Sequence, residues 1–164
     1  MRRIIFSLLI IGIFASCEES PKKEEGTPAD AKVQTVQPNN DDIEKDLKDR
    51  GYQTFSYKEG DTTYLMQQYY IVFLKSGPAR NQDSLTAAKL QEAHMAHMTR
   101  MFEEGYTSLT GPMGDDGNLR GIVIYNTATQ QEADSLARLD PMVRAGRLEV
   151  EVRPWWVAKG GKLK

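Results

Sequence analysis

Two short segments of this chain are apolar at consecutive positions, and this pattern restricts its fold more than any other. They are residues 70–74 (Tyr-Ile-Val-Phe-Leu) and 121–125 (Gly-Ile-Val-Ile-Tyr). Successive side chains of a strand point to opposite faces of the sheet, so each run predicts a strand buried on both faces. Residues 148–153 instead alternate apolar and charged side chains, which predicts an edge strand. The chain therefore needs a sheet with the two apolar runs at its centre.

The elements around these runs follow a regular order. We expect strands at 69–75, 106–110, 119–125 and 147–153, and helices at 83–104 and 130–139. Gly105 is typical of the end of the first helix, and Thr129 with Glu132 predicts a capping box for the second. The order βαββαβ is the ferredoxin-like arrangement. We therefore expect an α+β fold, with a ferredoxin-like domain and an antiparallel sheet over residues 66–157.

Residues 41–65 predict an N-terminal extension to this domain. A short helix at 41–50 precedes two strands, 52–57 and 62–65, which read as a β-hairpin. Residues 158–164 are expected to form a C-terminal tail. Two helices cover only one face of a four-stranded sheet, so the second apolar face predicts a homodimer, unless the hairpin covers it.

The N-terminal segment is typical of a secretory signal. Arg2 and Arg3 precede an apolar run at 4–14, which is shorter than the roughly 18 residues of a membrane-spanning helix. Ala15-Ser16-Cys17 follows and resembles a bacterial lipobox, although Phe14 stands where Leu is commoner. We expect residues 1–16 to be a lipoprotein signal peptide and Cys17 to carry the lipid. The alternative is an ordinary signal peptide beside a free thiol.

Residues 17–40 are polar and acidic, which predicts a disordered tether. We expect the chain to be lipid-anchored in the cell envelope, at the outer membrane, facing the periplasm or the cell surface. Glu18 and Glu19 directly follow the lipidated cysteine, an arrangement that resembles the surface-export signal of Bacteroidetes lipoproteins. The net charge of −2 and the lack of a basic block give no electrostatic basis for binding nucleic acid.

The two histidines, His94 and His97, both lie in the first predicted helix. At about 100° per residue, His94 shares a face with apolar residues and opposes Lys89, so it should point at the sheet. His97 lies nearer the edge of this stripe. Either histidine could simply be a satisfied core residue. A copper(I) site made of both histidines with Met95, Met98 and Met101 is a weaker alternative, and we expect neither a metal nor a cofactor.

Asp140 lies on the apolar face of the second predicted helix, directly before Pro141. We expect it at the C-terminal end of that helix, where the helix dipole opposes a carboxylate, so that it needs a partner. His94 is the available partner, and a His–Asp pair is a device for proton transfer. The alternative is an Asp-Pro turn. Asp115 and Asp116 could shape the mouth of a pocket, and Trp155 could stack on a ligand or anchor an interface.

These residues resemble a known family. The resemblance rests on residues 70–74, 94–98 (His-Met-Ala-His-Met), Gly111-Pro112, Asp140-Pro141 with Ala145-Gly146, and 149–155. They are similar to the YciI-like (YCII-related) proteins over about residues 66–157. The resemblance implies a ferredoxin-like domain that dimerises as a dimeric α+β barrel, with His94 and Asp140 matching a His–Asp pair proposed as the active site. A dehydrochlorinase is among the relatives.

From these observations we expect an envelope-anchored enzyme that acts on an unknown small molecule through His94 and Asp140. His97, Asp115, Asp116 and Trp155 are the candidate binding residues. The alternative is a non-catalytic ligand-binding or assembly lipoprotein in which the His–Asp pair only stabilises the fold.

Overall fold

The computed structural model describes residues 39–161 and residue 163. The predicted signal peptide, Cys17 and residues 17–38 of the predicted tether lie outside the described residues. No helix in the described part of the chain is long and apolar enough to span a bilayer.

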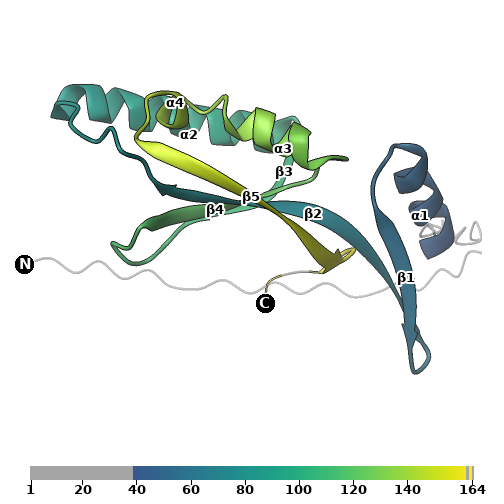
Figure 1. The fold of residues 1–164 in the computed structure, drawn as a ribbon. Helices are drawn as coiled ribbons and strands as arrows, with labels where there is room; N and C mark the ends of the chain where they lie inside the picture. Colours follow the sequence, from purple (N-terminus) through teal and green to yellow (C-terminus); the bar gives the residue numbers. More distant parts are fainter. Residues whose placement is uncertain (1–38, 162, 164) are drawn as a thin grey trace, which may run out of the picture. The chain divides into compact units, whose positions relative to one another are not determined.

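The described chain forms helices and a five-stranded antiparallel sheet, with helices packed on the sheet (Figure 1). The elements in chain order are α1 (Asn40–Asp49), β1 (Thr54–Glu59), β2 (Thr62–Ser76), α2 (Ser84–Glu103), β3 (Thr107–Pro112), β4 (Leu119–Tyr125), α3 (Gln130–Ala137), α4 (Pro141–Arg144) and β5 (Leu148–Ala158). The α+β class and the N-terminal hairpin are confirmed.

Strand β2 is the centre of the sheet. It pairs with β5 along one edge, and along the other edge first with β1 and then with β4, which pairs in turn with β3. The order β3-β4-β2-β5 is the ferredoxin-like order, with the two apolar runs in the central strands. The two strands expected at 62–65 and 69–75 are one continuous strand of 15 residues. β5 also runs further than expected, to Ala158, because the lengthened β2 offers it partners as far as Met66. Trp155 therefore lies within the last strand and not after it.

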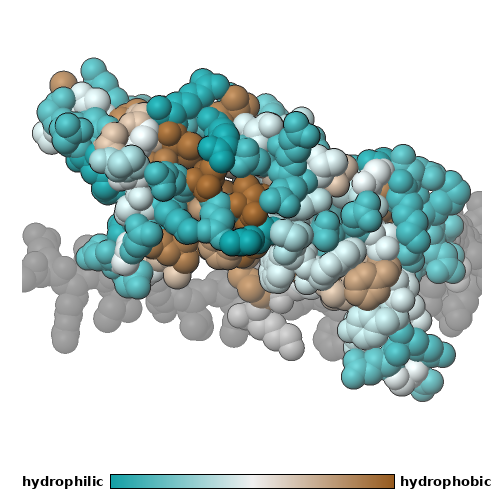
Figure 2. All heavy atoms as spheres, in the orientation of Figure 1, coloured by the Kyte–Doolittle hydropathy of each residue, from teal (hydrophilic) through white to brown (hydrophobic). Residues whose placement is uncertain are grey.

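The core lies between one face of the sheet and the helices α2, α3 and α4. It is built from alternate residues of the strands and the inward residues of these helices: Tyr70, Val72, Leu74, Met98, Met101, Val123, Tyr125, Ala133, Ala137, Met142, Leu148 and Val152. Figure 2 shows apolar side chains at the junction of the helices and the sheet, with hydrophilic ones around them.

The opposite face of the sheet is covered less completely. Ile71 and Phe73 alternate with the core residues of β2 and are only partly buried, whereas Ile124 of β4 is buried. Complete burial of both faces is therefore not reached within the described residues. The hairpin does not fold beneath this face, because β1 pairs edge to edge with β2 and so lengthens the sheet.

The extension has two different faces. On one, Glu44 of α1 accepts hydrogen bonds from Thr54 and Ser56 of β1. On the other, aromatic rings contact one another across the strands: Tyr57 stacks on Tyr64, and Phe55 meets Trp156 edge to face at 4.9 Å. Helix packing and cross-strand aromatic pairs together hold the hairpin to the domain.

The helix boundaries follow local signals. Asp83 caps α2 through the N–H of Thr86, and Gly105 after its end has a positive φ of 79°. Thr129 caps α3 through the N–H of Glu132, as expected. The Glu132 carboxylate accepts from Ala128 N–H and not from Thr129 N–H, so only one of the two hydrogen bonds of the expected capping box is formed.

The expected position of Asp140 is wrong. Helix α3 ends at Ala137, and Asp140 is the N-cap residue of α4, with its side chain accepting a hydrogen bond from Met142 N–H. Pro141 disfavours helical backbone at Asp140 and at the same time suits the first turn of a new helix. The carboxylate therefore stands where backbone N–H groups need an acceptor and not where a dipole repels it.

Candidate functional site

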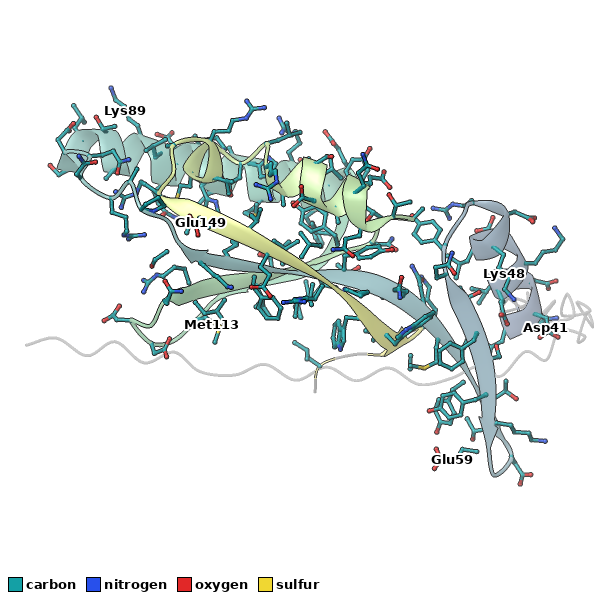
Figure 3. The ribbon with its side chains drawn as sticks, in the orientation of Figure 1. Asp41, Lys48, Glu59, Lys89, Met113 and Glu149 are labelled. Carbon is teal, nitrogen blue, oxygen red and sulfur yellow. The ribbon has the colours of Figure 1, made fainter. Side chains whose placement is uncertain are left out.

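A cavity of about 430 Å³ opens between α2 and the sheet. Helix α2 contributes Gln91, His94, Met95 and Met98, which recur at the spacing of one helix face. Strands, helix α4 and the segments beside them form the other walls: Leu74, Arg80, Thr110, Gly111, Pro112, Arg120, Gly121, Met142, Arg147 and Leu148. In Figure 3, Lys89 projects from the side of α2 away from the sheet, as the helical wheel predicts for a residue opposite His94. The volume is that of a pocket for a small organic ligand.

His94 and Asp140 are in direct contact. Asp140 Oδ2 lies 2.6 Å from His94 Nδ1, and Asp140 Oδ1 accepts from Met142 N–H at 2.8 Å. The side chain of Asp140 is 1% exposed and that of His94 is 13% exposed. The carboxylate is thus buried behind the imidazole, while the imidazole reaches the cavity wall.

This contact sets the role of each ring nitrogen. Because Asp140 accepts at Nδ1, the neutral imidazole carries its proton there, and Nε2 is left as the proton acceptor. When Nε2 takes up a proton, the resulting imidazolium faces a carboxylate that stabilises its charge. The arrangement can therefore accept a proton from a ligand in the cavity and return it.

Further polar groups are buried around the pair. Tyr125 is fully buried, and burial together with the negative charge of Asp140 raises the pKa of its hydroxyl. His97 is 3% exposed, and its Nδ1 lies 3.1 Å from Arg100 Nη2. Burial lowers the pKa of His97, with Asp140 acting in the opposite direction. Among the described residues, Tyr125 Oη and His97 Nε2 have no hydrogen-bond partner.

The other predicted binding residues are not brought together at the cavity. His97 lines a separate hollow with Arg100 and Arg144. Asp115 and Asp116 are exposed in the turn between β3 and β4, which Met113 begins (Figure 3). Trp155 on β5 is 43% exposed. None of these four residues lines the cavity beside His94.

Three arginines line the cavity that the sequence reasoning did not select: Arg80, Arg120 and Arg147. The sequence indicates them only weakly. Arg120 lies within the predicted strand 119–125 and Arg147 begins the predicted strand 147–153, and both strands belong to the segment that resembles the family. Nothing local indicates that the three converge.

The described residues do not bring together all five side chains of the copper alternative. Asp140 occupies Nδ1 of His94, and Met101 is buried in the core while Met95 is 53% exposed. His94, Met95 and Met98 line the cavity, whereas His97 lines a separate hollow and Met101 is buried in the core, so the five side chains do not converge.

Comparison with known protein families identifies the domain. The model of the YCII-related domain matches residues 68–156, which include the sheet core, α2 and both members of the His–Asp pair. The chain belongs to the YCII-related domain family. The matched residues exclude α1 and β1, so the hairpin extension lies outside the YCII domain.

Among solved structures, the chain is similar to the 5-chloro-2-hydroxyhydroquinone dehydrochlorinase of Burkholderia phenoliruptrix AC1100, determined in complex with 2,5-dihydroxybenzoquinone. The identity is 22% and the TM-score 0.40, and the match covers 53% of this chain and 92% of the dehydrochlorinase. No curated protein matches the chain.

The burial of His97 predicts how the stability of the YCII domain depends on pH. Because its pKa is lowered in the folded state, the unfolded chain binds this proton more readily, so the stability present above about pH 6.5 is lost as the pH falls toward the folded-state pKa. His97→Gln should therefore lose less unfolding free energy than the wild type between about pH 7.5 and pH 5, measured by chemical denaturation. His94→Gln keeps His97 and is the matched control. Equal losses in wild type and His97→Gln would contradict the prediction.

Proposed function

We propose that this YCII-domain protein is an enzyme of the cell envelope that acts on a small organic molecule by proton transfer. His94 is the general base and acid, and Asp140 orients it. The observation that carries the proposal is the 2.6 Å contact between a buried carboxylate and an imidazole that lines a cavity. A positioned acid–base residue of this kind contributes about 10²–10⁴-fold to a reaction rate.

The proposed step conserves protons. His94 Nε2 removes a proton from a C–H or O–H group of the ligand, and the electrons of that bond stay on the ligand as an anion. Asp140 stays ionised and stabilises the imidazolium. The same proton then returns from Nε2 to another atom of the ligand or to a leaving group.

A second candidate has support from the position of Asp140. Its carboxylate caps α4 through Met142 N–H and is almost completely buried, so the pair also holds α2 and α4 together. In this alternative the protein binds a ligand or a partner without catalysis, and His94 serves only to satisfy the buried charge.

Asp140→Asn separates the two candidates. Asparagine can still accept from Met142 N–H but no longer fixes the proton on His94 Nδ1. If the pair is catalytic, turnover should fall at least about 10²-fold, while the free energy of unfolding falls by less than about 2 kcal/mol. An unbiased ligand screen of the purified protein, including 2,5-dihydroxybenzoquinone, supplies the assay, with wild type and His94→Gln compared.

Asp134→Asn is the matched control, because it makes the same chemical change on α3, where Asp134 pairs with Arg138. It should leave turnover unchanged. Strong destabilisation by Asp140→Asn with unchanged turnover would favour the structural role and reject catalysis.

We also propose that the mature protein begins at a lipidated Cys17, which explains the polar segment between this residue and the folded domain. Cys17→Ala should release the protein from the membrane fraction, measured by fractionation and by mass spectrometry of the N-terminus. An unmodified N-terminus at another residue would contradict the anchor. Surface display is tested separately, by protease treatment of intact cells before and after replacement of Glu18 and Glu19.

The partly covered sheet face supports a homodimer. Phe73 and Ile122 pair on this face, and Leu109 of β3 is 41% exposed. Burial of such a face stabilises association by roughly 25 cal/mol per Å² of apolar surface before the costs of association. Sedimentation should show a dimer that Phe73→Glu dissociates. Leu85→Glu, at an exposed position of α2, is the control, and a wild-type monomer at micromolar concentration would contradict the prediction.

A further inference from the structure

The charge of the cavity differs from that of the whole chain. The chain has 21 basic and 23 acidic residues. The residues that line the cavity beside His94 include Arg80, Arg120 and Arg147 and, among those described, no acidic residue. Three permanent positive charges are therefore collected at one hollow of a slightly acidic protein.

Neutral groups, and not carboxylates, position the three arginines. Arg80 Nη1 donates to the carbonyl of Arg147 at 3.0 Å, and Arg120 Nη1 donates to the carbonyl of Gly117 at 3.1 Å. Arg147 Nη1 donates to Gln82 Oε1 at 2.7 Å. The nearest carboxylate recorded for any of them is Asp116, 3.8 Å from Arg120 and fully exposed. Screening by water makes that pair weak.

Three arginines elsewhere in the described chain have a carboxylate within hydrogen-bonding distance, whereas Arg100 lies 3.9 Å from Glu104 and Arg144 forms no ion pair with a described residue. Arg50 pairs with Asp46, Arg138 with Asp134 at 2.7 Å, and Arg153 with Glu151 at 2.6 Å. The cavity arginines differ from these three in having no close acidic partner. Hydrogen bonds to carbonyl and amide oxygens fix their direction without cancelling their charge.

Two backbone features direct these side chains to the cavity. The register of β2 and β4 shifts between Leu74 and Lys75, which pair with Gly121 and Leu119, so Arg120 is the extra residue of a β-bulge. A bulge can re-aim a side chain, and Arg120 lines the cavity together with its neighbour Gly121. On the other wall, Gly77 and Ala79 donate backbone hydrogen bonds to the carbonyls of Arg147 and Gly146, which fixes the segment that carries Arg147.

Arg147 also has a hydrogen-bond donor that no described residue accepts from. Its Nε is buried and has no hydrogen-bond partner among the described residues. A buried guanidinium N–H without an acceptor is costly, and a carboxylate or phosphate accepts from arginine at two nitrogens together. Arg147 therefore keeps donor capacity beyond its bond to Gln82.

Apart from His94, Gln91 and Thr110, the remaining side chains that line the cavity are apolar. Leu74, Met98, Met142 and Leu148 contribute side chains to the same cavity. A fully hydrated inorganic ion makes no use of such walls, whereas an organic molecule with an apolar body fills them. Methionine side chains also adapt to aromatic rings.

From these observations we infer that the cavity beside His94 binds a small organic anion, whose carboxylate or phosphate group contacts Arg80, Arg120 and Arg147 and whose apolar body packs between α2 and the sheet. As a statement about the substrate class, the inference rests on the proposed function. The binding of the anion is a separate property that is measured without turnover.

The test uses matched pairs of probes on the full-length protein. Benzoate, 4-hydroxybenzoate and phenyl phosphate are compared by calorimetry with benzamide, 4-hydroxybenzamide and phenol. We expect at least one anion to bind at millimolar concentration, and its neutral counterpart to bind at least about tenfold more weakly, which corresponds to 1.4 kcal/mol. Binding should weaken with added salt.

Arginine variants locate the binding. Arg80→Gln, Arg120→Gln and Arg147→Gln should each weaken the anion about tenfold or more, and Arg138→Gln on α3 is the control that should not. Because Arg147 is half-buried, Arg147→Lys is measured too, and it should retain part of the affinity if the glutamine variant is misfolded. Failure of all anions to bind, equal affinity of the neutral probes, or equal weakening by Arg138→Gln would overturn the inference.

The same variants separate this inference from the proposed function. Anion binding that depends on the cavity arginines, together with turnover that Asp140→Asn leaves intact, would retain the inference and reject the role of the pair. If turnover depends on His94 and neutral compounds bind as tightly as the anions, the proposed function would be retained and the inference overturned.

Discussion

A carboxylate buried in a protein must be satisfied by nearby donors, because removal of its charge from water costs several kcal/mol. Asp140 meets this requirement with two donors that belong to different elements: the imidazole of His94 on α2 and the backbone N–H of Met142 in α4. The buried charge therefore fixes α2 against the loop between α3 and α4. It also fixes the direction of the imidazole, so one interaction both orders the helix layer and prepares the face of the cavity.

The parts of the fold that depend on local sequence could be predicted. The apolar runs at 70–74 and 121–125 indicated the central strands. Helix α2 begins after Asp83, whose side chain caps it, and ends before Gly105, which adopts a positive φ. The fusion of two expected strands into β2 could not be predicted in this way. Its length depends on pairing with β5, whose residues lie about 80 positions away in the sequence.

The same distinction between local sequence and long-range contacts applies to the site. The helical wheel placed His94 toward the sheet because its position depends only on α2. The inward position of Asp140 was expected from the apolar face of the second predicted helix, but α3 ends at Ala137 and Asp140 faces inward as the N-cap residue of α4. The expected dipole at Asp140 was wrong because Pro141 begins a new helix rather than ending an old one. Arg80, Arg120 and Arg147 escaped sequence reasoning because a bulge in one strand pair and a contact between distant loops bring them together.

That contact between loops has a further consequence. Gly77 approaches Gly146 so closely that a Cβ at Gly77 would lie 2.2 Å from the Gly146 carbonyl oxygen, and Gly146 itself has a φ of 68°. The backbone next to Arg147, which lines the cavity, is thus main chain packed on main chain, with no room for larger residues. The charged groups beside it are the ends of long side chains, and the backbone contact between Gly77 and Gly146 does not include them. Divergence of ligand preference within such a scaffold is therefore expected to proceed by replacement of arginine tips over an unchanged backbone, so that chains of one fold can come to accept chemically different molecules.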